Sequence, residues 1–410
     1  MPWRGRSRSA NGVPASLKAA YAEAQAHYQA NRWLDAIALY RRIVADVPSE
    51  MRAWALLGLC LTQTGDLVAA TDALQRATEL EPQGANIFFR LGIVLYQRGL
   101  AAEAEAAFRR VVELDPRNID AQQNLAATLV DQGFHAQAKP YFDALVAERP
   151  DFELAWAGLA NVHRALGDTP AMINALERAV AINPDNVATR HLLIAARGQT
   201  PSHPDGADVE EFFDGYAARF ETHLVARLDY RAPETLVDLI YLHYPDRARF
   251  ARVLDLGCGT GLFGAAIRNV YAGDVLVGVD LSQRMVDATR ARALYSDVAK
   301  SEAELYLGQT QLRFDLIAAT DVFIYVGDVA GIFTHSARCL MSGGVLAFTI
   351  EPTSQAGFVL ETSGRYAHNP EHLKALAMQN GFRLIAEHAA PLRRDGQQFE
   401  DGLYLVLERR

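Results

Sequence analysis

Five prolines recur at a constant interval of 34 residues in the first half of this 410-residue chain: Pro48, Pro82, Pro116, Pro150 and Pro184. A fixed period between about 20 and 50 residues is typical of repeat proteins, in which each unit packs only against its neighbours. We therefore expect the first half to be a stack of similar units. Such stacks form extended binding surfaces, so any chemistry is expected in the second half.

Each 34-residue unit follows one pattern of large apolar, small and turn residues. A small residue at a fixed place lets two helices approach closely, at Gly58, Gly92, Ala126 and Ala160. A left-handed residue, usually glycine and sometimes asparagine, commonly ends a helix, and the residues in that place are Asn31, Gly65, Gly99, Gly133 and Gly167. Proline ends the second helix, because it lacks an N–H and clashes with the preceding turn. The pattern predicts five helix–turn–helix units.

In this pattern the chain resembles the tetratricopeptide repeat (TPR) proteins over roughly residues 15–186. The resemblance implies an all-α solenoid over residues 15–197, made of five repeats and a capping helix at 187–197. It also implies that a protein or peptide partner binds in a concave groove. The groove residues expected from the repeat positions are Arg52, Asn86, Phe89, Arg90, Tyr96, Gln123, Asn124, Asn161 and Arg164. The alternative for each is a solvated helix face.

The acidic charge of the chain lies in its second half. The net charge is −9, from 40 Lys and Arg against 49 Asp and Glu. Residues 1–200 hold 20 Lys and Arg and 21 Asp and Glu. The remaining 20 basic and 28 acidic residues give residues 201–410 a net charge of −8. Neutralising phosphates requires clustered Lys and Arg. We therefore expect no nucleic-acid partner, although a local basic groove is compatible with these numbers.

The sequence gives no sign of a membrane, a metal or a disulfide. Residues 1–14 carry three arginines but no apolar stretch, so we expect a disordered tail and not a secretory signal. No apolar run reaches the ~18 residues of a membrane span. The three cysteines, Cys60, Cys258 and Cys339, fall in different elements without metal-ligand spacing. We interpret them as free thiols of a cytoplasmic protein.

The second half alternates between strand-like and helix-like patterns. Residues 198–208, rich in Gly, Pro, Ser and Asp, are expected to form a linker or hinge before a domain at 209–410. The strand-like runs are 252–256, 275–279, 314–319, 344–350, 383–388 and 403–408, and the helical ones are 262–271, 283–294, 329–340 and 370–380. Such alternation predicts a parallel α/β sheet. Because no helix joins the last two strands, one edge strand is expected to be antiparallel.

The most informative stretch is VLDLGCGTG, residues 253–261, in which a strand runs through a glycine loop into a helix. Glycines let backbone amides approach a ligand, and the helix N-terminus favours negative charge. A dinucleotide site would need its third glycine at position 262, but here it is Gly261, which suits a ligand without a pyrophosphate. Asp280 lies 21 residues after Gly259, at the end of the next strand, where a carboxylate can accept both ribose hydroxyl protons.

At these residues the chain resembles the class I S-adenosylmethionine-dependent methyltransferases, over roughly residues 210–410. The resemblance implies a Rossmann-like domain with a mostly parallel seven-stranded sheet, and S-adenosylmethionine as cofactor. Asp255, Gly257 and Gly259 would line the methionine end, Asp280 would bind the ribose, and Asp321 would lie under the sulfonium. The full cofactor-binding set implied is Asp255, Gly257, Cys258, Gly259, Thr260, Gly261, Asp280, Leu281, Ser282, Met285, Glu302, Asp321 and Val322. The alternatives are a helix N-cap for Asp321 and a surface position for Glu302.

Further segments resemble a narrower group, the predicted bacterial methyltransferases fused to TPR repeats. These segments are 213–220 with His223 and Leu224, then 314–328, 343–351 and 363–369. This resemblance narrows the fold more than the function, because it implies no particular acceptor.

Methyl transfer from an activated sulfonium depends mainly on position and desolvation, and a base is needed only if the acceptor arrives protonated. Substrate groups are expected on loops at the carboxyl ends of the strands. We predict Tyr216, His223 and His368 as catalytic candidates, with Tyr325, Glu351 and Tyr366 as further candidates. The alternatives are core packing for Tyr216 and a place before a helix N-cap for His368.

Several acceptor classes are not expected. The fourth strand is followed by Thr-Asp-Val-Phe and not by Asn-Pro-Pro-Tyr or Asp-Pro-Pro-Tyr, which argues against methylation of the adenine amino group or a glutamine amide. The position of the cysteines argues against a cysteine-nucleophile base methylase. An oxygen or nitrogen of a small molecule, a peptide or a carrier protein remains.

The sequence therefore predicts an S-adenosylmethionine-dependent methyltransferase whose TPR repeats bind a protein or peptide. Two alternatives stay open. In one, the acceptor is a small molecule and the repeats are a scaffold. In the other, the chain is a non-catalytic adaptor that senses S-adenosylmethionine.

Overall fold

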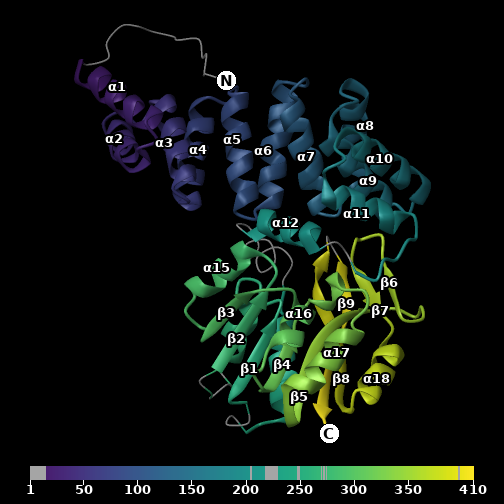
Figure 1. Ribbon diagram of the computed structural model, residues 1–410. Coiled ribbons are helices and arrows are strands. Elements are labelled where there is room, and N and C mark those ends of the chain that lie inside the picture. The colour runs from purple at the N-terminus through teal and green to yellow at the C-terminus, as the bar shows by residue number, and fades with distance from the viewer. Residues whose placement is uncertain are drawn as a thin grey trace. The chain divides into compact units, whose positions relative to one another are not determined.

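The computed structural model describes residues 15–203, 206–217, 230–246, 250–268, 270, 273, 275–395 and 398–410. Figure 1 shows helices alone in the first half and a twisted sheet flanked by helices in the second. The chain forms two compact units, Met1–Leu145 and Val146–Arg410. We describe each unit by itself.

The first half consists of paired antiparallel helices, as the 34-residue period predicts. The first unit contains four pairs and the second begins with a fifth pair and one more helix. Their bounds are α1 Ala15–Gln29, α2 Trp33–Asp46, α3 Met51–Gln63, α4 Leu67–Leu80, α5 Ala85–Gln97, α6 Ala101–Leu114, α7 Ile119–Asp131, α8 His135–Glu148, α9 Glu153–Ala165, α10 Thr169–Ile182 and α11 Val187–Ala196. The predicted helical repeats are thus confirmed, and α11 lies where the capping helix was expected.

The turn and crossing residues take the predicted conformations. The four turn glycines have φ between 74° and 80°, and Asn31 has φ 57°, which is the left-handed region that glycine and asparagine enter most easily. At the crossings, a Cβ on Gly92 would lie 2.7 Å from the ring of Phe108, and one on Gly58 would lie 2.6 Å from Leu74 Cγ. The small residues therefore permit the close approach of the two helices in a repeat.

The repeated prolines also accept hydrogen bonds, which the sequence pattern did not reveal. Trp54 Nε1 donates to the carbonyl of Pro48 at 2.9 Å, and Trp156 Nε1 donates to that of Pro150 at 3.0 Å. In the equivalent place, Gln122 bonds the carbonyl of Pro116 at 2.6 Å, and Arg190 bonds that of Pro184 at 2.7 Å. A side chain six residues after each of these prolines thus ties the loop between repeats to the next helix.

The second half contains a seven-stranded sheet of the order β3-β2-β1-β4-β5-β9-β8, with a small hairpin, β6–β7, added beside β5. The strand bounds are β1 Arg252–Leu256, β2 Val275–Asp280, β3 Asp297–Lys300, β4 Phe314–Ala319, β5 Leu340–Pro352, β6 Phe358–Leu360, β7 Tyr366–His368, β8 Phe382–Asp395 and β9 Gln398–Arg409. The five strands from β3 to β5 pair in parallel.

The antiparallel strand is not at the edge, where it was expected. Strand β9 pairs antiparallel with both β5 and β8, and therefore lies between them. The edge strand β8 consequently runs parallel to β5. A direct β8–β9 connection places the two strands side by side, and the hydrophobic run 403–407 makes β9 the better strand to bury inside the sheet.

Helices cover both faces of this sheet (Figure 1). One hydrophobic core joins Leu254 and Leu256 to residues of α16, α17 and α18, and a second joins Val253 to residues of α13 and α14. A strand buried on both faces reads as a continuous apolar run, and Asp255 is the exception among the buried residues of β1. The helix bounds are α12 Gly206–Tyr216, α13 Ala232–His243, α14 Leu262–Ile267, α15 Gln283–Ala291, α16 Ala303–Gln309, α17 Ala330–Cys339 and α18 Pro370–Gln379.

The hairpin β6–β7 packs against the capping helix and the segment that follows it, within the unit Val146–Arg410. His191 Nε2 lies 3.0 Å from the carbonyl oxygen of Gly364, and Tyr366 donates its hydroxyl to the carbonyl of Pro201 at 3.0 Å. The backbone N–H of Asp328 bonds the carbonyl of Ser202 at 2.8 Å. The part of the expected linker that the structure describes is therefore held by hydrogen bonds to the sheet domain.

The part of the chain that the structure describes contains no helix that is long and apolar enough to cross a membrane. Within the same residues, no group of three or more His, Cys, Asp or Glu side chains is arranged to hold a metal ion. Cys60, Cys258 and Cys339 are buried free thiols.

Candidate functional site

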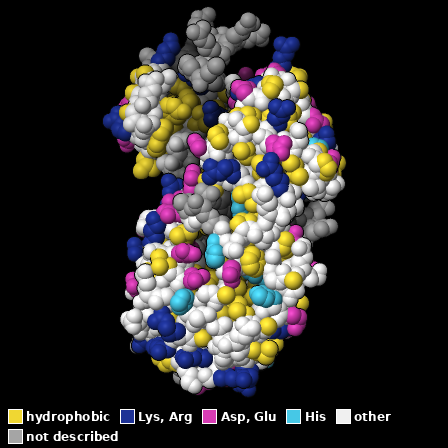
Figure 2. All heavy atoms as spheres, turned by 45° about the vertical axis from the view of Figure 1, so that its right-hand side comes forward, with side chains coloured by type: hydrophobic (Ala, Val, Ile, Leu, Met, Phe, Trp, Pro, Cys, Tyr) yellow, Lys and Arg dark blue, Asp and Glu magenta, His cyan; other side chains and the backbone are white. Residues whose placement is uncertain are grey.

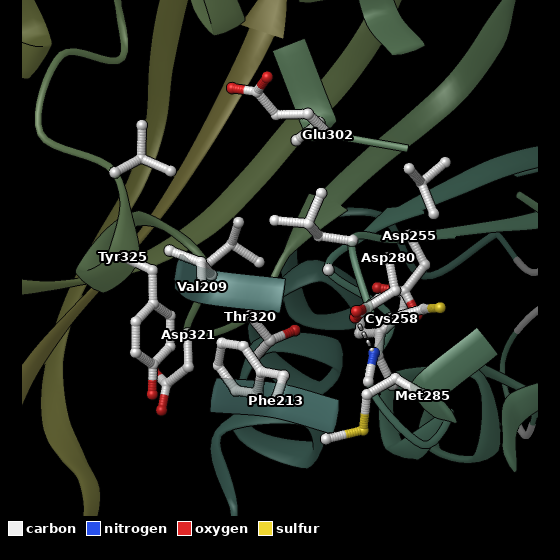
Figure 3. A pocket seen from close by; sticks show the side chains of 18 of the residues that line it. Val209, Phe213, Asp255, Cys258, Asp280, Met285, Glu302, Thr320, Asp321 and Tyr325 are labelled. Atoms are coloured by element: carbon white, nitrogen blue, oxygen red, sulfur yellow. Dashed lines mark hydrogen bonds between the residues drawn. The ribbon is translucent and has the colours of Figure 1, made fainter. Parts of the chain in front are cut away.

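A cavity of about 650 Å³ opens at the carboxyl ends of β1, β2 and β4. Parallel α/β sheets bind ligands at this edge. Figure 3 shows Asp255, Cys258, Asp280 and Met285 grouped at one end of the cavity, and Asp321 and Tyr325 at the other. We call these the glycine-loop end and the arginine end, because residues 257–260 line the first, and Arg393, another lining residue, pairs with Asp321 at the second.

The glycine loop is compact because its backbone uses conformations that other residues avoid. Gly257, Gly259 and Gly261 have φ values of 62°, 54° and 88°. A Cβ on Gly257 would lie 2.5 Å from Cγ2 of Val322, which is closer than any real contact. The loop therefore requires glycine, and helix α14 begins at Leu262 directly after it, as predicted.

Asp280 closes this end of the cavity from the end of β2. Its Oδ2 accepts the N–H of Gly259 at 2.8 Å, and its Oδ1 accepts the N–H of Ser282 at 2.9 Å. A carboxylate has about four acceptor positions, so these bonds orient the group and leave acceptor positions for a ligand. Burial raises the pKa of Asp280, and the backbone hydrogen bonds oppose that rise.

Asp255 lies beneath the loop in a short chain of hydrogen bonds. The Tyr295 hydroxyl donates to Asp255 Oδ2 at 2.6 Å and accepts the N–H of Gly264 at 3.0 Å. Burial raises the pKa of Asp255 to about 7, and the Tyr295 hydrogen bond works against this rise. Burial next to these carboxylates also raises the pKa of the Cys258 thiol, which therefore stays protonated and unreactive.

Two buried hydroxyls show that the cavity suits a polar ligand. Thr260 Oγ1 and Thr320 Oγ1 both belong to residues that line it, and neither has a hydrogen-bond partner among the described residues. A buried polar atom without a partner is costly. A ligand with hydroxyl, amino or carboxylate groups would satisfy both.

The arginine end contains a buried network of charges. Arg393 is 3% exposed and donates to Asp321 Oδ2 at 2.9 Å and to Glu351. Arg365 Nη1 lies 3.8 Å from the same Glu351. With all four groups ionised the network is neutral. Burial raises the pKa of Glu351, and the two arginines oppose this.

Asp321 stands in a strained backbone conformation at the end of β4. Its φ is 55°, a left-handed value that costs free energy for a residue with a side chain and is most often found at functional sites. Thr349 holds it there, because its Oγ1 accepts the N–H of Asp321 at 2.8 Å and donates to Asp321 Oδ1 at 3.1 Å. Asp321 is therefore fixed at the cavity wall, and it is not a helix N-cap.

Aromatic rings complete the arginine end. The rings of Phe213 in α12 and Tyr325 pack edge to face with centroids 4.9 Å apart, and Tyr230 is buried beside them on the cavity wall. Burial raises the pKa of both tyrosines. Their hydroxyls therefore remain protonated at neutral pH.

Most of the predicted cofactor residues line the cavity. Those that do are Asp255, Gly257, Cys258, Gly259, Thr260, Asp280, Leu281, Met285, Glu302, Asp321 and Val322. Gly261 and Ser282 are not lining residues; Gly261 precedes α14, and Ser282 caps α15 by accepting the N–H of Met285. Glu302 is exposed, and Figure 3 shows its carboxylate directed away from the other labelled side chains.

The predicted catalytic residues have other positions. His368 is fully buried in β7, its Nε2 lies 2.9 Å from the carbonyl oxygen of Phe323, and it does not line the cavity. Tyr216 is the last residue of α12, and its side chain is not described. His223 lies outside the described residues. Of the further candidates, Tyr325 lines the cavity. Glu351 is bound by Arg393, which lines the cavity, and Tyr366 packs against α11.

Sequence reasoning missed Tyr230, Thr320, Arg365 and Arg393 as lining residues. Arg365 lies inside the segment 363–369 that was singled out, but nothing in that segment marked it as part of the cavity. Arg393 lies near the end of β8, a strand placed by its pairing with β9, and it contacts Asp321, which is 72 residues away in the sequence. No local signal could have found Arg393.

Comparisons with known protein families match two separate regions of the chain. Residues 226–395 match the model of a methyltransferase domain, and tetratricopeptide repeat models match at 21–85, 69–119, 95–162 and 153–196. The chain therefore contains TPR repeats followed by a methyltransferase domain.

Two curated relatives are O-methyltransferases that align with part of the chain. The ubiquinone biosynthesis O-methyltransferase of Xylella fastidiosa (strain 9a5c) is 31% identical over 155 residues, which are 37% of this chain and 62% of that protein. The malonyl-[acyl-carrier protein] O-methyltransferase of Acetivibrio thermocellus is 25% identical over 124 residues, 30% of this chain and 43% of that protein. The chain thus spans less than two thirds of the length of each.

Solved structures of TPR proteins and of methyltransferases are both similar to parts of this chain. The TPR protein YrrB covers 43% of this chain, with 97% of its own length matched, 20% identity and a TM-score of 0.41. The magnesium protoporphyrin IX methyltransferase of Synechocystis PCC 6803 with bound SAM covers 50% of this chain, with 97% of its own length matched, 17% identity and a TM-score of 0.38. The methyltransferase-domain match and the fit of the glycine loop, Asp280 and the two threonine hydroxyls identify S-adenosylmethionine as the cofactor.

Proposed function

We propose that this chain, a methyltransferase domain preceded by tetratricopeptide repeats, methylates an oxygen or nitrogen of a protein or peptide that its repeats hold. The observation that carries the proposal is the two-ended cavity. One end is built to bind a polar cofactor, and the other offers rings and charges that the cofactor does not need.

The residues of the glycine-loop end hold and orient the cofactor. Gly257 and Gly259 bring the backbone close to its methionine part, Asp280 accepts hydrogen bonds from its ribose hydroxyls, and Thr260 and Thr320 supply hydroxyls that have no other partner among the described residues. When bound, the cofactor supplies an electrophilic methyl group on a sulfonium. Such a group needs no further activation, so these residues contribute by positioning and by excluding water.

The residues of the arginine end would orient the acceptor. Tyr230 and Tyr325 keep their protons and can donate hydrogen bonds, and Arg365 adds a positive charge. Asp321 and Glu351 already pair with Arg393, so their oxygens are engaged with a guanidinium and are not directed at an acceptor's proton. The site therefore suits an acceptor that arrives without a proton to lose, such as a carboxylate. The names of the two relatives, both O-methyltransferases, favour oxygen as the accepting atom.

A small-molecule acceptor is the second candidate, because the Xylella relative is named for ubiquinone biosynthesis and aligns with 37% of this chain. In that case the repeats would be a scaffold. Transfer of labelled methyl groups to lysate fractions separates the two: a labelled protein band supports the first candidate, and label found only in small molecules supports the second.

The cofactor step is tested first, by calorimetric titration of S-adenosylhomocysteine. We expect micromolar binding to the wild type and at least a tenfold loss in Asp280→Ala, because that change removes the ribose acceptor. Asp287→Ala, an exposed carboxylate on α15, is the matched control and should bind as the wild type does. A wild type that does not bind would refute the proposal, and binding without methyl transfer to any fraction would favour the sensor alternative.

A further inference from the structure

A second cavity, of about 250 Å³, lies between the fifth repeat and the turn that joins β6 to β7. All of its lining residues belong to the unit Val146–Arg410. They come from α9, α10, α11 and residues 361–365: Ala157, Ala160, Asn161, Arg164, Met172, Leu176, Leu192, Ser363 and Arg365. The volume is below the ~300–1,000 Å³ of small-molecule pockets, so it suits a single side chain.

The charge of this second cavity is one-sided. Two arginines line it, and none of its described lining residues is acidic. Asn161 Oδ1 accepts from Arg164 Nε at 3.3 Å and from Nη2 at 3.0 Å, which fixes the direction of that guanidinium. A guanidinium has five donors in a rigid fork, so Arg164 retains donors for a further acceptor. The amide of Asn161 and the hydroxyl of Ser363 add polar groups beside it.

Arg365 lines both cavities. On the side of the larger cavity its Nη1 lies 3.8 Å from Glu351, a loose contact, because Glu351 is bound more closely by Arg393. The turn that carries Arg365 is fixed in place. The neighbouring Gly364 accepts a hydrogen bond from His191, and a Cβ on it would lie 3.1 Å from Leu192 Cδ2. One guanidinium therefore stands between the fifth repeat and the arginine end of the catalytic cavity.

We propose that the second cavity binds the carboxylate side chain of a single acidic residue in a peptide segment held by the fifth repeat, with Arg164 and Arg365 as its two partners. Arginine forks match a carboxylate geometrically and form strong charge-assisted bonds. Apolar contacts from Met172, Leu176 and Leu192 cover the stem of that side chain. The inference rests on the proposed function, since it places the acceptor residue beside this acidic residue and opposite the cofactor.

The second cavity attracts a carboxylate through its own two arginines and not through the charge of the whole chain. The chain carries a net charge of −9. In the lower half of Figure 2, Lys and Arg side chains gather toward the bottom of the view and Asp and Glu lie above them. Charges farther away than about 10 Å are largely screened, so the two arginines that line the cavity attract a carboxylate at short range.

The test uses the full chain and three fluorescently labelled, end-blocked peptide pools. Each pool has neutral random residues around one central position, which is glutamate, glutamine or phosphoserine. Fluorescence anisotropy is measured at low and at high salt. We expect the glutamate pool to bind about tenfold more tightly than the glutamine pool, the scale of a hydrogen bond to a charged group, with the preference weakened by salt. The preference should vanish in Arg164→Gln, weaken in Arg164→Lys, which keeps the charge but loses the fork, and persist in Arg178→Gln, an exposed residue of α10 that lines neither cavity.

Equal binding of the glutamate and glutamine pools, or an unchanged preference in Arg164→Gln, would overturn the inference. Tighter binding of the phosphoserine pool would overturn the assignment to a carboxylate. Titration of S-adenosylhomocysteine into the same preparations separates this failure from that of the proposed function. Retained cofactor binding without a glutamate preference refutes the second-cavity inference alone, whereas loss of cofactor binding in the wild type refutes the proposed function.

Discussion

At the scale of the residue, Gly257 decides whether the cofactor loop can form. Its φ of 62° and the 2.5 Å distance from a Cβ to Val322 oppose any side chain. We expect Gly257→Ala to weaken S-adenosylhomocysteine binding at least tenfold in calorimetry, because the loop must shift away from the ligand. Gly308→Ala is the control, since its Cβ would lie 3.6 Å from His335, an ordinary contact. Equal affinity in the two variants would show that the loop tolerates a side chain.

Asp255 makes the stability of the fold depend on pH. Its pKa in the folded protein is about 7 because of burial, against about 3.9 in an unfolded chain. Between these values the folded state binds more protons, so this group's contribution to stability is present at low pH and is lost as pH rises through 7. At about 1.4 kcal/mol per pKa unit, the effect amounts to a few kcal/mol.

The pH dependence is measured by thermal melts without ligand. As the pH is raised from about 4 to 7.5, the melting temperature of the wild type should fall relative to that of Asp255→Asn by several degrees. Asp287→Asn, at an exposed position, should keep the wild-type slope. Parallel pH profiles for the wild type and Asp255→Asn would mean that Asp255 does not titrate in this range.

At the scale of the element, each repeat is a helix pair closed by local geometry, and four of the five repeats are joined to the next helix by a side-chain bond to the proline carbonyl. The indole of Trp54 and the carbonyl of Pro48 form such a bond at 2.9 Å. We expect Trp54→Phe to lose about 0.5–1.5 kcal/mol of stability, the net value of one hydrogen bond, with the lower end favoured by its exposure. Circular dichroism during urea unfolding gives the midpoint shift.

Trp33→Phe is the matched control for this element. Its ring packs edge to face on Tyr28 with centroids 5.4 Å apart, and a phenyl ring retains that contact. If both variants unfold at the same midpoint, the bond to the proline carbonyl contributes nothing measurable.

At the scale of the whole molecule, the boundary between repeats and catalytic domain does not coincide with the boundary between compact units. The sequence places the linker at 198–208, yet the compact unit begins at Val146 and includes the fifth repeat. Ala195 and Ile194 of α11 pack on Leu360 and Tyr366 of the hairpin β6–β7.

Two fragments test this grouping. Residues 149–410 should bind S-adenosylhomocysteine as the full chain does. Residues 198–410 lose α11 and with it the packing on Leu360 and Tyr366 and the bond between His191 and Gly364. We expect that fragment to melt several degrees lower in a calorimetric scan. Equal melting temperatures would indicate that the fifth repeat does not stabilise the catalytic domain.

Much of the fold and about half of the site were predictable. Local sequence was enough to predict the turn glycines such as Gly99, the glycine loop and Asp280. A positive φ requires particular residues, and a strand–loop–helix segment requires them in a fixed order. The helix expected at 283–294 ends at Ala291, and the strand β3 gave only a faint signal, since it has four residues. Boundaries of this kind depend on packing and not on local pattern.

The sequence by itself determined the repeat period, the succession of strands and helices along the chain, and the cofactor loop. Only the tertiary structure decided that β9 lies inside the sheet, that β6–β7 contacts α11, and that Arg365 and Arg393 meet at Glu351. The physical reason is distance along the chain. Conformational preferences act between residues that are near neighbours in the sequence. The order of strands within the sheet and the buried ion pairs instead arise from contacts between segments that are tens to hundreds of residues apart.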